Sequence, residues 1–367
     1  MGLERLSPKG GGALARTLAG LVAVAALTLG LVACGGSDGT GAAEAPETGV
    51  AASETSKDLF IGEPGPKMCE GGTYKLGVDY FSTTEEFAQQ WLRGIKEVAE
   101  ESGCVEISAL SDELDPSKAV ANAQTFVQQN VDGVLLLQVI AAAQPGVMRI
   151  LDEAGIPAVA SAVPAPGATF VSVPDYASGV DGGEFLAREY RKSGNKEVPY
   201  LLIGTFPDGG QVSIDRLNGV IDGIKQAIEV EIPDDHVVEI DTKADPVGTR
   251  EKALAALNNI PEGAPILAAA INDSTTYAQF QALKQSGRAD EAMVLGIGGV
   301  NPEGLEFVCK NKSYVGALSH MPDRWGKYLV PAILARIQEK AVPPSVDVPW
   351  KILTRQNMRE TYPDAPC

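Results

Sequence analysis

Apolar and polar positions change their period along this chain, and the changes predict where its elements begin and end. Residues 74–80 have the pattern of a β-strand. Thr84 is the predicted N-cap of the following helix, which Gly103 closes. Large apolar side chains recur at helical spacing within that helix, at Phe87, Trp91, Ile95 and Val98. It therefore has one apolar face.

Strands and helices continue to alternate as far as residue 340. Further strands are expected at 105–110, 134–137, 158–161, 169–173, 198–204, 237–241, 266–270, 293–297 and 314–318. Further helices are expected at 115–130, up to 154, and at 176–192, 213–227, 247–259, 274–286, near 305 and at 324–340. Parallel strands need crossover helices, so this order predicts an α/β fold. Two runs of about five strands each predict two doubly wound parallel-sheet lobes.

The first residues have the pattern of a secretory signal. Basic residues precede an apolar run at 18–32, which at about 15 residues is short for a membrane span. The stretch Leu31-Val32-Ala33-Cys34 resembles the lipobox of bacterial lipoproteins. This resemblance implies that residues 1–33 are removed and that the Cys34 thiol is acylated. The alternative is an ordinary secretory signal with a coincidental cysteine.

Residues 34–66 are rich in Gly, Ala, Glu, Ser, Thr and Pro. Such a composition buries too little apolar surface to offset the entropy of ordering, so we predict a flexible tether. The formal net charge of −18 argues against nucleic acid as a partner and against electrostatic attachment to anionic lipid. We therefore expect the membrane to be contacted through the lipid alone.

Four cysteines follow Cys34, and an even number in an exported chain indicates two disulfides. We expect Cys69 to pair with Cys104, because each precedes one of two neighbouring predicted strands. We expect Cys309 to pair with Cys367, because that bridge would hold the end of the chain.

Signals of catalysis are weak in this sequence. It has two histidines, His236 and His320, which excludes a histidine-rich metal site and leaves little for a catalytic triad. The glycine-rich stretch at 296–299 lacks the spacing of a dinucleotide-binding loop. We expect no metal, no cofactor and no enzymatic activity.

Five segments resemble motifs of the type I periplasmic binding proteins, the solute receptors of ABC importers. In order, they are AGIPAV at 154–159, VPDYASG at 173–179, RLNG at 216–219, AIND at 270–273 and MPDRWG at 321–326. The pattern is most similar to the ribose- and galactose-binding branch. The resemblance implies two lobes joined by a hinge, with a small polar solute, such as a sugar or polyol, bound between them.

Ligands of open parallel sheets bind beyond the carboxyl ends of the strands, so two facing sheets would form one cleft. The candidate ligand-binding residues follow the predicted strands or line the next helix; they are Phe81, Phe87, Gln138, Ser161, Arg216, Asn272 and His320. Arginine offers a fork of donors, and an amide offers a donor and an acceptor. An aromatic ring packs on the apolar face of a sugar. The resemblance places most of these residues at ligand-facing positions.

Each candidate also has a purely structural interpretation. Arg216 could lie on a helix surface, Asn272 could cap the helix that begins at 274, and His320 could be a hinge residue. The others could serve packing alone. Asp175 is expected at the hinge, where the chain crosses between the lobes, and not at the ligand.

Two positions depart from the family pattern. Sugar-binding members often carry a charged or strongly polar pair where this chain has Ala162-Val163, and an aspartate where it has Gly298. These departures argue against the standard pyranose arrangement. They widen the expected ligand to a polyol, a modified sugar or another small polar molecule.

We expect one lobe at 73–174 and 321–350 and the other at 175–320 and 351–367. The expected function is that of an extracytoplasmic, lipid-anchored substrate-binding protein. It would close on its solute and dock, as a monomer, to the permease of an ABC transporter. Alternatives are a receptor that presents the solute to a membrane kinase or chemoreceptor, and an extracytoplasmic hydrolase.

Overall fold

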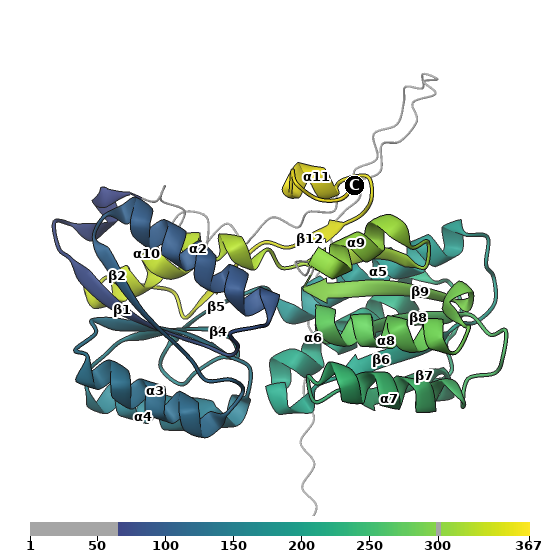
Figure 1. Cartoon of the computed structure of the whole chain (residues 1–367), viewed down its shortest axis with the longest axis horizontal. Helices are drawn as coiled ribbons and strands as arrows, with labels where there is room; N and C mark the ends of the chain where they lie inside the picture. Colours follow the sequence, from purple (N-terminus) through teal and green to yellow (C-terminus); the bar gives the residue numbers. More distant parts are fainter. Residues whose placement is uncertain (1–64, 299–301) are drawn as a thin grey trace, which may run out of the picture. The chain divides into compact units, whose positions relative to one another are not determined.

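The computed structural model describes residues 65–298 and 302–367. They form two six-stranded sheets (Figure 1), with the orders β11-β5-β4-β3-β1-β2 and β12-β10-β9-β8-β6-β7. Every neighbouring pair is parallel except β10 with β12. Helices cover both faces of each sheet (Figure 1), so the predicted α/β fold with two doubly wound parallel sheets is confirmed.

Lobe one is built on the first sheet. Its strands are β1 (Tyr74–Tyr80), β2 (Val105–Ser111), β3 (Gly133–Gln138), β4 (Ala158–Ala162), β5 (Thr169–Ser172) and β11 (Ser345–Asp347). One face packs against α2 (Glu86–Ser102) and α10 (Gly326–Ile337), and the other against α3 (Pro116–Gln128) and α4 (Gln144–Glu153). The periodic apolar face of α2 is buried here, with Trp91 and Ile95 inaccessible to solvent.

Lobe two is built on the second sheet. Its strands are β6 (Tyr200–Thr205), β7 (Val237–Asp241), β8 (Ile266–Ala270), β9 (Ala292–Gly298), β10 (Tyr314–Ser319) and β12 (Lys351–Leu353). One face packs against α5 (Asp175–Lys192) and α6 (Gln211–Ala227). The other packs against α7 (Pro246–Leu257), α8 (Asp273–Gln285) and α9 (Pro302–Lys310), and α11 (Met358–Thr361) lies near the C-terminus.

The chain passes between the two sheets three times. The passages lie between β5 and α5, between β10 and α10, and between β11 and β12. Asp175, the predicted hinge residue, opens α5 directly after the first passage. The strands β11 and β12 were not predicted from the sequence, because three residues are too few to show a period.

Two local predictions have clear outcomes. The predicted N-cap at Thr84 is wrong, because α2 begins at Glu86, and the Ser82 hydroxyl accepts from the N–H groups of Thr84 and Glu85 at 3.1 and 3.0 Å. The disulfides are Cys69–Cys104 and Cys309–Cys367, as predicted. They hold the segment before β1 and the C-terminus.

The predicted signal sequence, Cys34 and most of the predicted tether lie outside the described residues. Within the part of the chain that the structure describes, none of the helices combines the length and the apolarity that a bilayer crossing requires.

Candidate functional site

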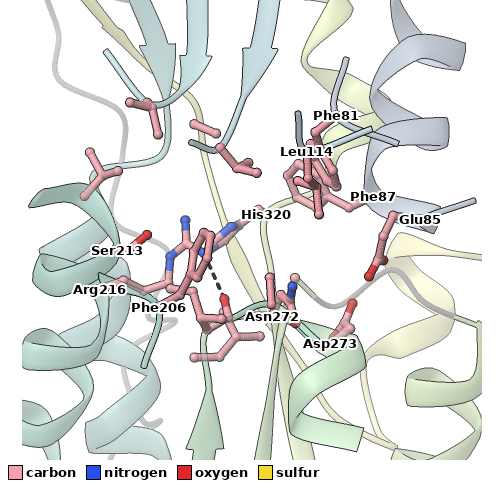
Figure 2. A pocket seen from close by; sticks show the side chains of 18 of the residues that line it. Phe81, Glu85, Phe87, Leu114, Phe206, Ser213, Arg216, Asn272, Asp273 and His320 are labelled. Carbon is pink, nitrogen blue, oxygen red and sulfur yellow. Dashed lines mark hydrogen bonds between the residues drawn. The ribbon is translucent and has the colours of Figure 1, made fainter. Parts of the chain in front are cut away.

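A cavity lies where the carboxyl ends of the strands of both lobes come together (Figure 2), and we call it the cleft. In lobe one, Phe81, Leu114 and Val139 follow the first three strands and line it. In lobe two, Phe206 follows β6, Ile271 follows β8, and both line the cleft. The polar side chains of the lining are Glu85, Glu86, Ser213, Arg216, Asn272, Asp273 and His320. The rule that ligands bind beyond parallel strand ends therefore locates the cavity correctly.

Arg216 lies on α6, and its guanidinium is held from two sides. Its Nε donates to Oδ1 of Asp175 at 2.7 Å, its Nη2 lies 2.5 Å from the same oxygen, and its Nη1 donates to the Ile271 carbonyl at 3.0 Å. Both side chains are largely buried, at 15% and 4% exposure. An arginine has five N–H groups, so these three contacts leave two of them, and the residue lines the cleft. Burial raises the pKa of Asp175, and the Arg216 guanidinium partly offsets this rise.

Two of the sequence motifs form one packing unit behind this ion pair. A Cβ atom at Gly179 on α5 would collide with the carbonyl oxygen of Arg216, and one at Gly219 on α6 with that of Tyr176. The glycines of VPDYASG and RLNG therefore allow the backbones of α5 and α6 to touch. This contact places Asp175 beside Arg216. Asp175 lies where the chain crosses between the lobes, and it also orients the Arg216 side chain.

Asn272 and Asp273 stand at the start of α8. The Asn272 side chain accepts from the Thr275 N–H at 3.0 Å, so it caps the helix as the structural interpretation proposed, and it also lines the cleft. Asp273 is its buried neighbour. A Cβ atom at Gly298, whose φ is +109°, would lie 2.8 Å from Oδ2 of Asp273. Asp273 thus fills the space that a side chain at 298 would need.

His320 follows β10 and is 1% exposed. The residue lines the cleft, and its Nε2 has no hydrogen-bond partner among the described residues. Burial lowers the pKa of His320 well below its usual value, and the positive charge of Arg216 lowers it further. The imidazole is therefore neutral at physiological pH, and its Nε2 can accept or donate one hydrogen bond, according to the tautomer. The other histidine, His236, stacks on Tyr200 outside the cleft.

Five of the seven predicted ligand-binding residues line the cleft: Phe81, Phe87, Arg216, Asn272 and His320. Their contact with a ligand remains a prediction. Phe87 also packs edge-on against Trp325, with 5.7 Å between the ring centroids. The structure does not bring Gln138 and Ser161 into the lining.

Gln138 is turned into lobe one. Its Nε2 donates to Oδ2 of the buried Asp79 at 2.6 Å, and Asn122 donates to the other carboxylate oxygen at 2.7 Å. Burial, together with the negative charge of Asp112, raises the pKa of Asp79 to about 7. The position of Gln138 at a strand end was readable from the sequence, but its partner, 59 residues away, was not.

The wall next to Ser161 has a strained backbone. Ala162 has a φ of +63°, and the Val163 N–H donates to the Ser161 carbonyl at 2.7 Å. A bond between residues i+2 and i around a positive φ is typical of the classic γ-turn, which is rare and strained. This turn ends β4 and places Ala162 and Val163 in the lining. Both are apolar.

Three acidic lining residues, Glu85, Glu86 and Asp273, were not among the predicted candidates. Asp273 directly follows Asn272 after a predicted strand, so the sequence pattern could have identified it as a candidate lining residue. Glu85 accepts a hydrogen bond from the Ser274 hydroxyl at 2.7 Å, which joins α2 of lobe one to α8 of lobe two. No sequence period connects residues so far apart.

A family model for the periplasmic binding protein domain matches residues 76–341, more than half of the 367-residue chain. The chain belongs to this family. The resemblance predicted from the five motifs is thereby confirmed. In the family, the chain is similar to the ribose import binding protein of Bacillus subtilis (strain 168), with 22% identity over 288 residues that cover 77% of this chain and 88% of that protein.

Solved structures share the fold. One is an ABC transporter solute-binding protein from Bacillus halodurans with bound myo-inositol, with a TM-score of 0.66, 22% identity, and coverage of 79% of this chain and 97% of that one. Another, from Agrobacterium vitis with bound allitol, has a TM-score of 0.66, 21% identity, and coverage of 79% and 98%. This periplasmic binding protein thus has the two-lobed α/β fold of solute-binding proteins.

Proposed function

We propose that this periplasmic binding protein captures a sugar or polyol in the cleft and delivers it to the permease of an ABC importer. The observation that carries the proposal is the set of polar side chains that line the cleft from lobe two, above all the partnerless Nε2 of buried His320. A buried polar atom without a partner is costly unless a ligand satisfies it. The relatives named above support the ligand class, because their names give ribose, myo-inositol and allitol as the molecules bound.

Capture would proceed by hinge closure. Two lobes, 73–174 with 321–350 and 175–320 with 351–367, would rotate about the three passages of the chain between the sheets. The hydrogen bond from Ser274 to Glu85 would hold the two sides of the cleft together. Small-angle scattering should show compaction when solute is added, and an unchanged radius at saturation would contradict closure.

The proposal includes export and a lipid on Cys34. The acidic chain would then work outside the cytoplasm, held to the membrane by that lipid. Metabolic labelling with a fatty-acid analogue should label the wild-type protein, while Cys34→Ser should abolish the label.

The direct test is a thermal-shift screen of the purified full-length protein against aldoses, ketoses, polyols and inositols, with amino acids and nucleosides as comparison classes. A solute at 100 times its dissociation constant adds about 2.7 kcal/mol to the free energy of unfolding, which raises the melting temperature by a few degrees. His320→Leu should lose most of that shift, and His236→Leu, which changes the histidine outside the cleft, should keep it. Shifts by amino acids or nucleosides alone would contradict the ligand class.

The same solutes distinguish binding from catalysis. We propose capture without chemical change, so chromatography of the solute after incubation should show it intact. A hydrolase, for which the carboxylates of the cleft would be the candidates, would convert it. A sensory receptor would bind the same solute, so a permease deletion that leaves uptake unchanged would favour that alternative.

A further inference from the structure

The lobe-one wall of the cleft is chemically unlike the lobe-two wall. Lobe one contributes a continuous apolar set, Phe81, Phe87, Leu114, Val139, Ala162 and Val163. Figure 2 shows Phe81, Leu114 and Phe87 grouped on one side of the cavity. The polar lining side chains of this lobe are Glu85 and Glu86 at the start of α2, and Glu85 is engaged by Ser274. A solute in the cleft therefore meets mainly a hydrocarbon surface here.

Polar side chains do exist at the strand ends of lobe one, but the fold keeps them out of the lining. Asp79 and Gln138 bind each other in the interior. Ser161 is fully buried, and the strained turn at Ala162 presents alanine and valine to the cleft in its place. Strain of this kind persists where the surrounding structure imposes it, and such outliers gather at ligand sites.

Lobe two carries the arginine, amide and imidazole groups of the lining, next to apolar side chains of its own, among them Phe206, Ile271 and Ile297. Figure 2 shows nitrogen atoms of Arg216, His320 and Asn272 on the side opposite Phe81 and Leu114. Asp273 supplies carboxylate oxygens in the space beside Gly298. This wall thus offers donors and acceptors together, which suits hydroxyl groups.

We infer that the cleft selects a solute with one hydroxylated edge and one apolar edge, namely a deoxy or O-methyl derivative of a sugar or polyol. This inference rests on the proposed function. The hydroxyl groups bind to lobe two, and the deoxy or methyl edge packs against lobe one. A hydroxyl group on that edge would lose its water without gaining a partner. An apolar site discriminates by about 10–100-fold for one such group.

The test is a set of matched pairs measured by titration calorimetry on the full-length protein. Each pair joins a parent to its derivative: galactose with 6-deoxygalactose, mannose with 6-deoxymannose, glucose with 3-O-methylglucose, and myo-inositol with an O-methylinositol. At least one derivative should bind about 10-fold or more tightly than its parent. Parents that bind as tightly as all their derivatives would overturn the inference and leave the proposed function intact. A folded protein that binds neither member of any pair would contradict both.

A variant connects the preference to the wall. Val163→Thr places a hydroxyl group in the lobe-one lining at nearly constant volume, so it should reduce the derivative-to-parent ratio several-fold. Val120→Thr makes the same change on α3, outside the cleft, and should leave the ratio as it is. If Val163→Thr shows no cooperative unfolding and is therefore not folded, Val139→Thr, at another lobe-one lining position, is measured in its place. An unchanged ratio in a folded lining variant would overturn the role of the wall.

Discussion

The two lobes have similar six-stranded sheets, but they use the polar residues at the strand ends and on the following helices differently. In lobe one, Asp79 and Gln138 bind each other in the interior. In lobe two, Arg216, Asn272 and His320 line the cleft. Topology therefore decides which residues come near a site, and local partners decide whether their side chains reach it. The wall from lobe one is consequently mainly apolar, whereas the wall from lobe two combines polar side chains with apolar ones.

The largest expected effect concerns the ion pair behind the polar wall. Arg216→Ala leaves the buried Asp175 carboxylate without its partner, which should lower the free energy of unfolding by about 3–5 kcal/mol. Arg149→Ala removes an exposed arginine paired with Glu153 and should cost less than about 1 kcal/mol. Urea denaturation of both variants measures the difference. A loss below about 1 kcal/mol for Arg216→Ala would show that Asp175 does not depend on it.

A smaller effect is expected from separating α5 and α6. Gly179→Ala inserts a methyl group against the Arg216 carbonyl, which should cost up to about 3 kcal/mol and move Arg216 relative to the other residues of the cleft lining. Solute affinity should fall as well. Gly146→Ala on α4 meets only a Val120 methyl group at 3.1 Å and should be neutral or slightly stabilising. Equal stability of the two variants would rule out the proposed contact.

The buried carboxylate of lobe one predicts a pH dependence. The native pKa of Asp79 is about 7, above the value of an unfolded aspartate, so the native state binds the proton more tightly. The free energy of unfolding should then fall by on the order of 2 kcal/mol between pH 5 and pH 8. Asp79→Asn should reduce this fall, since an amide does not titrate and Gln138 can rotate to offer its partnerless Oε1.

Denaturation at both pH values measures the effect. Asp152→Asn, at an exposed position of α4, is the matched control and should keep the wild-type dependence. A wild-type protein equally stable at pH 5 and pH 8 would contradict the buried carboxylate.

Much of the fold was predictable because its signals are local. Helical spacing located α2. Gly179 and Gly219 lie in the motifs VPDYASG and RLNG, which are recognisable from the sequence. The features that could not be predicted are contacts between segments far apart in the sequence. Gln138 and Asp79 are separated by 59 residues, and Ser274 and Glu85 by 189. The direction in which a strand-end side chain points depends on such partners, so the sequence alone could not separate Gln138 from His320.

The division of the cleft into a mainly apolar lobe-one wall and a lobe-two wall with most of the hydrogen-bonding groups is most directly tested by a crystal structure with a bound solute. The solute oxygens should lie within about 3 Å of the side chains of Arg216, Asn272 and His320, and its carbon edge should contact Phe81 and Val163. Solute oxygens bound by Gln138 or Ser161 of lobe one would contradict that division.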